Sequence, residues 1–432
     1  MLDSFKNPPA QYRRPIPMTS DRMLPMREMK REFDRKAVVD MQSSSEPASG
    51  ASDVVPRPYY RLFADYTARV RYALAQGRRS AQVAILVPST PIEGLTSEYL
   101  ELYRDRLLKE HIEYAIVDED SVRRATAIDQ SLIIERDRYE LLIMPPVDSV
   151  TYQAAVKIEE FVEDGGRLLA TLRIPTKDSH GNKHEEVQSI FAGIFRGESD
   201  MLFVETMPAD LREIVCKAIK PTVSIRQNSA ECRDITYTHK ICKDEELFFF
   251  ANNSMEAREV RLSIRCDWAP HILDPETGER IALINCTQMG SRTIFLHRFE
   301  GCGSLLLSFT DTPSLTIPTP PVECADEINI PSQWDITIDG SQPNVARYSQ
   351  IVIIPEFFGN RRAFISAEHL GDAVEFIVNG ASANVRAWPP FMTDITALVK
   401  PGPNEISLKI TDMPAKDSNP SGLLKSVTIS IC

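Results

Sequence analysis

Residues 58–215 alternate between short apolar runs and amphipathic segments. Apolar side chains recur at helical spacing from Tyr59 to Gly77, over 99–110 and over 151–163. Short buried strands separated by amphipathic helices are typical of a parallel sheet, so the pattern predicts an α/β domain. The expected strands are 82–88, 114–117, 141–144 and 167–170.

From about Val223 the period of the pattern becomes two. Runs of alternating or apolar residues are separated by polar turns such as Asn252-Asn253 and 274–278. This pattern predicts a small antiparallel β-sandwich over residues 216–311. Its expected strands are 247–251, 260–264, 269–273, 281–283, 293–296 and 305–308.

The last segment, 326–432, has the pattern of a second β-sandwich. Asn379-Gly380 follows the apolar run 374–378, and this dipeptide tolerates the positive φ angles of a tight hairpin. Asp394 is placed to bind nearby backbone N–H groups and fix a turn. Pro401-Gly402 forms another turn, after which Ile406, Leu408 and Ile410 alternate toward the core.

The two other segments lack a packing pattern. Residues 1–57 are polar and proline-containing, and we expect a partly disordered extension with one exposed helix over about 22–41. Residues 312–325 are rich in proline and are expected to be a linker. The fold class predicted for the whole chain is therefore α/β plus all-β, in several domains.

The composition of the chain disfavours some classes of binding partner. The chain has 432 residues, and its net charge of -12 argues against nucleic acid and anionic membranes while leaving neutral sugars possible. No apolar run approaches the roughly 20 residues of a membrane span. The first residues lack a secretory signal, so we expect a cytoplasmic chain as it stands, although localisation is otherwise unknown. The eight cysteines contain no C-x-x-C, and we expect reduced thiols.

Three short motifs invite metal or nucleotide chemistry. His180 and His184 have the i, i+4 spacing of a metal-binding helix, but Gly181 and the polar surroundings favour a solvated loop. The sequence 274–278 offers clustered oxygens for Ca²⁺, but it is also a turn built by an Asx hydrogen bond, and we favour the turn. Residues 88–91 follow the first strand at the usual ligand edge, yet lack glycines that admit a phosphate. We expect no metal and no cofactor.

The order of these motifs resembles a known family. Val378-Asn379-Gly380, 388–391 (WPPF), 394–396 (DIT) and Asn404 resemble a galactose-binding-like jelly-roll sandwich. Residues 141–146 and 161–167 resemble an amidotransferase-like, flavodoxin-like α/β domain, and 249–253 and 273–278 resemble strand signatures of the same proteins. Together, residues 58–432 resemble the region that follows the catalytic barrel in α-L-rhamnosidase-like glycoside hydrolases.

The resemblance implies an accessory role. The catalytic (β/α)₈ barrel of that family needs about 250 residues, whereas some 57 precede the match, so no catalytic residue is carried over. Amidotransferase chemistry is excluded because residues 1–215 contain no cysteine. The leading hypothesis is a non-catalytic part that packs on a catalytic barrel partner or weakly binds a glycan. The alternatives are a stand-alone hydrolase of rhamnose- or galactose-containing glycans and a purely structural interaction protein.

One carbohydrate-binding site is predicted within this hypothesis. Trp388 and Phe391 are candidates for an aromatic platform, with Asn379 and Arg386 as hydrogen-bonding groups. The competing interpretation is that Trp388 packs the edge of the sandwich. Adjacent carboxylates such as Glu159-Glu160 and 185–186 diverge and are expected to be solvated surface, not a glycosidase pair. The oligomeric state is not predicted.

Overall fold

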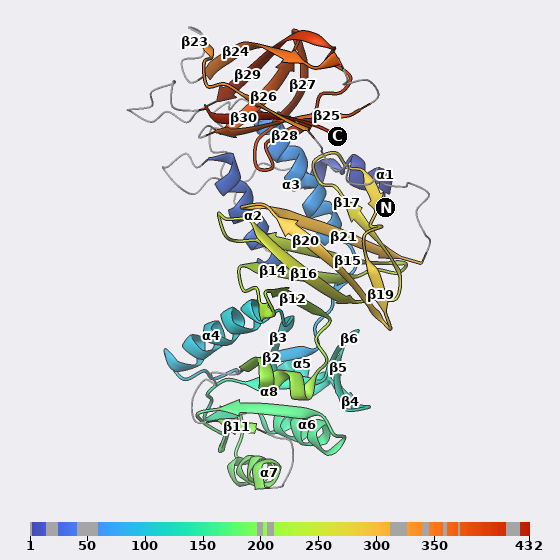
Figure 1. Cartoon of the computed structure of the whole chain (residues 1–432). Helices are drawn as coiled ribbons and strands as arrows, with labels where there is room; N and C mark the ends of the chain where they lie inside the picture. The colour runs from blue at the N-terminus through green and yellow to red at the C-terminus, as the bar shows by residue number, and fades with distance from the viewer. Residues whose placement is uncertain are drawn as a thin grey trace.

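The chain folds into a mixed α/β structure in which none of the described sheets closes into a barrel. Figure 1 shows a parallel sheet with its helices at one end, a sandwich in the middle and a second sandwich at the other end. The computed structural model describes residues 2–13, 25–40, 59–196, 202–204, 211–311, 326–338, 345–356, 361–369, 372–411 and 424–432.

The parallel sheet has five strands in the order β11-β9-β7-β2-β3. In chain order this is 2-1-3-4-5, one of the two common orders of doubly wound sheets. Its strands are β2 (Val83–Val87), β3 (Tyr114–Asp118), β7 (Leu141–Met144), β9 (Arg167–Thr171) and β11 (Leu202–Val204). Its helices are α4 (Leu95–Lys109), α5 (Glu119–Arg124), α6 (Tyr152–Glu163), α7 (His184–Arg196) and α8 (Leu211–Ala218).

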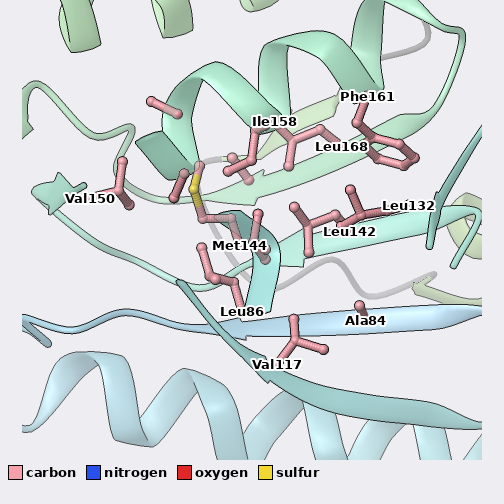
Figure 2. Packing of buried hydrophobic residues seen from close by; sticks show 14 of the residues in the cluster. Ala84, Leu86, Val117, Leu132, Leu142, Met144, Val150, Ile158, Phe161 and Leu168 are labelled. Carbon is pink, nitrogen blue, oxygen red and sulfur yellow. The ribbon is translucent and has the colours of Figure 1, made fainter. Parts of the chain in front are cut away.

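Helices cover both faces of this sheet, which explains the continuous apolar runs of its strands. On β2, Ala84 and Leu86 pack toward α6 and α7, whereas Val83 and Ile85 pack toward α4 and α8. Figure 2 shows the first of these layers, with Ile158 of α6 above the strands. The predicted strands and the helix at 151–163 are confirmed. The three-stranded sheet of β4 (Thr126–Ile128), β5 (Ser131–Ile134) and β6 (Asp137–Tyr139) and the helices α5, α7 and α8 were not predicted.

The middle sandwich consists of two antiparallel sheets that enclose an aromatic-rich core. One sheet contains β1 (Arg78–Arg79), β14 (Ile235–Ile241), β15 (Glu245–Asn252), β21 (Ser304–Thr310), β17 (Ala269–Leu273) and β18 (Arg280–Ala282). The other contains β13 (Ala230–Glu231), β12 (Val223–Gln227), β16 (Arg258–Arg265), β20 (Arg292–Phe299) and β19 (Thr287–Met289).

The C-terminal sandwich is also built from two antiparallel sheets. One has β22 (Asp326–Ile330), β30 (Leu424–Ile431), β25 (Ala363–His369) and β28 (Met392–Asp394). The other has β23 (Asp335–Ile338), β24 (Val345–Ile354), β29 (Gly402–Thr411), β26 (Ala373–Val378) and β27 (Ala381–Arg386). The predicted hairpin is confirmed, because Asn379 and Gly380 both have positive φ. The Asp394 carboxylate accepts the Thr396 N–H at 2.9 Å, also as predicted.

Three N-terminal helices lie between the two sandwiches: α1 (Leu2–Lys6), α2 (Met26–Asp40) and α3 (Tyr60–Leu74) (Figure 1). They share an apolar cluster with Phe249 of β15 and with Ala373 and Trp388 of the C-terminal sandwich. The expected helix near 22–41 is therefore present, but the prediction that it is exposed is wrong. The buried residues of α2 include Met26, Met29, Lys30, Asp34 and Val38.

The remaining sequence predictions concern the polar segments, the cysteines and membrane spans. The linker 312–325 and much of 1–57 lie outside the described residues. Six cysteines are free thiols, but Cys432 is disulfide-bonded, which corrects the expectation that all eight are reduced. Within the described part of the chain, no helix is long and apolar enough to cross a membrane. The small remaining elements are the 3₁₀ turn Ala10–Tyr12 and the strands β8 (Ser149–Val150) and β10 (Lys177–Asp178).

Candidate functional site

A cavity of about 340 Å³ opens where α2 and α3 meet the two sandwiches. Its wall combines aromatic rings with charged groups, the composition that sugar-binding and catalytic pockets commonly have. It is also the place where the sequence-predicted Trp388 and the 274–278 turn come together. The side chains that line the cavity include Lys30, Tyr66, Glu276, Glu300, Ser304 and Trp388.

A buried ion pair forms one side of this cavity. The Lys30 ammonium lies 2.7 Å from the Asp34 carboxylate, one helical turn away on α2, and both side chains are 2% exposed. Tyr66 of α3 donates its hydroxyl hydrogen to the other Asp34 oxygen at 2.7 Å. Ser304 of β21 lies within hydrogen-bonding distance of both Lys30 and Tyr66. We call Lys30, Asp34, Tyr66 and Ser304 the junction network.

Burial controls the chemistry of the junction network. Desolvation raises the pKa of Asp34 above its usual value, although the Lys30 ammonium acts in the opposite direction. Desolvation, with the nearby Asp34 charge, also raises the pKa of Tyr66 well above its usual value. Each group is satisfied by its neighbours, as buried polar groups in folded proteins generally are. The network is suited to joining α2, α3 and β21.

The turn at 274–278 presents Glu276 to the cavity. The Asp274 carboxylate accepts the Glu276 N–H and the Thr277 hydroxyl, each at 2.8 Å, and Gly278 has a φ of +80°. This is the Asx turn that was favoured over a Ca²⁺ loop. Among the described residues no group of His, Cys, Asp and Glu side chains is arranged to hold a metal ion.

Glu276 connects the middle and C-terminal sandwiches. One of its carboxylate oxygens accepts the Trp388 indole N–H at 2.7 Å, and the other accepts a hydrogen bond from Arg386. From the opposite side, Arg69 of α3 donates to the backbone carbonyls of Pro275 and Glu276, at 2.8 and 2.6 Å. The turn is therefore held by α3 while its side chain holds the C-terminal sandwich.

The predicted carbohydrate-binding residues do not form one platform. Trp388 is 4% exposed, and its ring packs edge-on against Tyr66 with the centroids 5.4 Å apart, so it has no open face for a sugar. Phe391 packs against the core of the C-terminal sandwich instead. Asn379, at the tip of the hairpin, donates to the Leu398 carbonyl and the Asn404 side chain of neighbouring segments, and Arg386 binds Glu276. The contacts of Trp388 favour the competing interpretation of this residue as packing, and the carbohydrate-binding site stays a prediction.

The carboxylates at this cavity are already engaged. Both Glu276 oxygens and both Asp274 oxygens accept hydrogen bonds, and one oxygen of Glu300 accepts from Arg298 at 3.0 Å. Burial lowers the pKa of His297 to about 4, which leaves it neutral near pH 7. A glycosidase needs one carboxylic acid and one free carboxylate facing each other across a cleft. The arrangement is better suited to holding the domains together.

The other candidate motifs are structural as well. His180 lies in a loop, whereas His184 begins α7 and accepts the Asp178 N–H at 3.0 Å through Nδ1. At the ligand edge of the parallel sheet, the Glu119 carboxylate accepts the N–H groups of Ser89 and Thr151, at 2.7 and 2.6 Å. The protein's own carboxylate thus occupies the position where doubly wound folds bind a phosphate.

Several known proteins are similar to this chain in sequence or in fold. A rhamnosidase structure from Novosphingobium sp. PP1Y matches 86% of this chain and 41% of its own, with a TM-score of 0.63 and 16% identity. The "Putative beta-glucuronidase" of Formosa agariphila is 20% identical over 223 residues, which are 50% of this chain and 18% of that protein. A beta-galactosidase structure from Bacillus circulans sp. alkalophilus matches 57% of this chain and 44% of its own, with 13% identity and a TM-score of 0.38.

The match to a family model places the chain among proteins related to glycoside hydrolases. The family model for alpha-L-rhamnosidase (Glyco_hydro_106) matches residues 58–285, more than half of the chain. The chain belongs to this alpha-L-rhamnosidase family. It spans less than half the length of the rhamnosidase and about a fifth of the length of the glucuronidase that it matches.

The sequence analysis missed the junction network. Lys30 and Asp34 belong to a helix that was expected to be exposed, and Ser304 was counted only within a strand. One signal was present, because Met26, Met29, Ala37 and Val38 recur with Lys30 and Asp34 on one side of that helix. A charged pair at i, i+4 among apolar residues is a sign of a buried ion pair, although surface pairs use the same spacing.

Proposed function

We propose that this chain supplies a non-catalytic accessory part of an alpha-L-rhamnosidase-type glycoside hydrolase and packs on a catalytic barrel partner. In this proposal the parallel-sheet domain is amidotransferase-like and the C-terminal sandwich is a galactose-binding-like jelly roll. The chain then acts as a rigid scaffold beside the catalytic part. Family membership and the absence of a closed barrel among the described sheets support this role.

The state of Glu276 carries the proposal. Both of its carboxylate oxygens are used to bind Trp388 and Arg386, and α3 holds the backbone of its turn. A general acid must have a proton to give, and a nucleophile must direct an oxygen at the sugar. The Glu276 oxygens are directed instead at Arg386 and Trp388 of the same chain. These contacts fix the orientation of the C-terminal sandwich.

A hydrolysis assay tests the proposal. The purified chain is incubated with aryl α-L-rhamnoside and aryl β-galactoside, beside a mock purification, and beside the variants Glu276→Gln and Glu300→Gln. The expected release of the aryl group equals that of the mock sample for all three proteins. Turnover by the wild-type chain that is lost in either variant contradicts the proposal and favours a stand-alone hydrolase.

A further inference from the structure

The outer face of the β12-β16-β20 sheet carries a concentration of positive charge that the junction does not explain. Inward-facing residues of these strands, such as Ile225 and Leu262, fill the core of the middle sandwich. The outward-facing positions include five arginines, and one of them, Arg298, lies opposite Glu259 at the far end of the sheet. We call Arg226, Arg261, Arg265 and Arg292 the arginine face; its strands lie near the centre of Figure 1.

Strand register places these arginines in opposed pairs. Arg226 lies directly opposite Arg261 across β12 and β16, and Arg265 lies directly opposite Arg292 across β16 and β20. Neighbouring strands are about 4.8 Å apart, and four residues along a strand span about 13 Å. Like charges directly opposite each other destabilise a sheet. Two such pairs in a chain of net charge -12 are therefore unexpected on stability grounds.

Arg226, Arg261 and Arg292 line a cavity of about 420 Å³, and its described lining contains no carboxylate. Ser224 and Ser263, opposite each other in register, lie between the two arginine pairs. Arg212 of α8 adds a further cation, and Ile294 adds an apolar surface. Leu296, opposite Arg261, is 70% exposed beside it.

Most of this charge is not neutralised by carboxylates of the described residues. The Arg261 side chain has no hydrogen bond or ion pair among the described residues. In the part of the chain that the structure describes, the Arg292 side chain donates only to oxygens of Ser263 and Pro221, which are uncharged. One carboxylate, Glu231, serves both Arg212 and Arg226, at 3.1 and 3.2 Å. The cavity is therefore electropositive and partly open, with the Arg226 side chain 56% exposed.

We propose that the arginine face binds an acidic polysaccharide through the oxyanions of its sugar residues. Guanidinium groups pair well with carboxylate and sulfate oxygens. Ser224 and Ser263 offer hydrogen bonds to sugar hydroxyls, and Ile294 and Leu296 offer apolar surface to the ring C–H groups. The inference uses the membership of a glycan-active family, but it is independent of whether the chain is catalytic.

The test is calorimetric titration of the whole chain with a short oligogalacturonate, at about 0.1 M salt, where the Debye length is about 10 Å. Fully methyl-esterified oligogalacturonate has the same backbone without charge and is the ligand control. A sulfated carrageenan oligosaccharide distinguishes sulfate from carboxylate. The binding variant is Arg226→Gln with Arg261→Gln, and the matched control is Arg61→Gln with Arg347→Gln, which removes equal charge at two exposed positions outside this sheet.

We expect saturable binding of at least one acidic oligosaccharide, weakened about tenfold or more in the binding variant and changed little in the control variant. No binding to the methyl ester is expected. An equal loss of affinity in both variants contradicts the inference, because binding would then depend only on the net charge of the chain. Absence of binding to either acidic ligand by the folded wild type also overturns it. Thermal melting of both variants confirms that they are folded.

Discussion

The junction network and the arginine face use charge in opposite ways. In the junction network, Lys30 lies among an acidic oxygen, a hydroxyl and a carbonyl, at 2.7 to 3.0 Å. In the arginine face, Arg261 lies opposite Arg226 and has no acidic partner among the described residues. Buried charge needs compensation, whereas an exposed cluster of like charge can be tolerated if it holds a ligand. Compensated charge in the junction network therefore stabilises the fold, whereas uncompensated charge on the arginine face is available to a ligand.

The largest expected effect is at the buried pair. Lys30→Met leaves the Asp34 carboxylate without its cation in an apolar surrounding, and we expect unfolding to become easier by about 3–5 kcal/mol. The measurement is urea denaturation followed by tryptophan fluorescence. The matched control is Lys109→Met, since Lys109 forms an exposed i, i+4 pair with Asp105, and its loss should cost less than about 0.5 kcal/mol.

A double variant tests whether the stability lost in Lys30→Met is due to the unpaired Asp34 charge. Replacing both members, Lys30→Met with Asp34→Leu, removes the uncompensated charge and should restore much of the lost stability. A double variant no more stable than Lys30→Met would show that the packing shape, not the charge, is essential at this position.

The next effect concerns the link between the sandwiches. Glu276→Leu leaves the Trp388 indole N–H and the Arg386 guanidinium without their shared acceptor, and we expect a loss of about 2–3 kcal/mol. The readout is limited proteolysis, in which the variant should release a C-terminal fragment faster than wild type. Glu279→Gln, at an exposed position of the same turn region, is the control. Unchanged proteolysis in Glu276→Leu would mean that the sandwiches are held by the apolar cluster alone.

A pH-dependent effect is expected where the parallel-sheet domain meets the middle sandwich. Burial acts to raise the pKa of Glu231, but the His111 hydrogen bond and the Arg212 charge outweigh it and lower this pKa from 4.5 to about 2. The resulting stability is present above pH 4.5 and is lost as the pH falls toward 2. Glu231→Gln should therefore be less stable than wild type by about 1–2 kcal/mol at pH 6, with the difference vanishing near pH 2.

Thermal melting across this pH range checks the prediction. Glu213→Gln removes an exposed glutamate of α8 and should track wild type throughout. A constant difference between Glu231→Gln and wild type at every pH would contradict the assigned ion pairs.

The smallest effect has the opposite sign. Arg261→Gln removes a like-charge contact with Arg226, so we expect a gain of about 0.2–1 kcal/mol at low salt. The gain should fade at high salt, because salt screens exposed charges. Differential scanning calorimetry at two salt concentrations measures it. Destabilisation by this substitution would show that Arg261 serves the fold.

The sequence predicted local structure better than the contacts between distant segments. Buried strands such as Leu141–Met144 were predicted because apolar residues run together, and the Asn379-Gly380 hairpin because its backbone angles limit the choice of residue. The burial of Lys30 could not be predicted in this way, since it depends on Ser304, 274 positions away. The same holds for Trp388, whose partner Glu276 lies in another sandwich.

The arginine face illustrates the same limit. Alternation along β16 places Arg261, Ser263 and Arg265 on one side of the strand, and the sequence alone contains that information. Their pairing with Arg226 and Arg292 depends on strand register, which alternation does not determine. A polar face could be predicted, but an electropositive cavity could not.

Hydrogen exchange of the wild-type chain, with and without an acidic oligosaccharide and read peptide by peptide, compares both regions in one measurement. Slowed exchange should be confined to peptides that cover β12, β16 and β20. Peptides that contain Glu276 and Trp388 should exchange slowly in both conditions, because they are already bonded within the protein. Ligand-induced protection around Trp388, with none on β12, β16 and β20, would contradict both assignments.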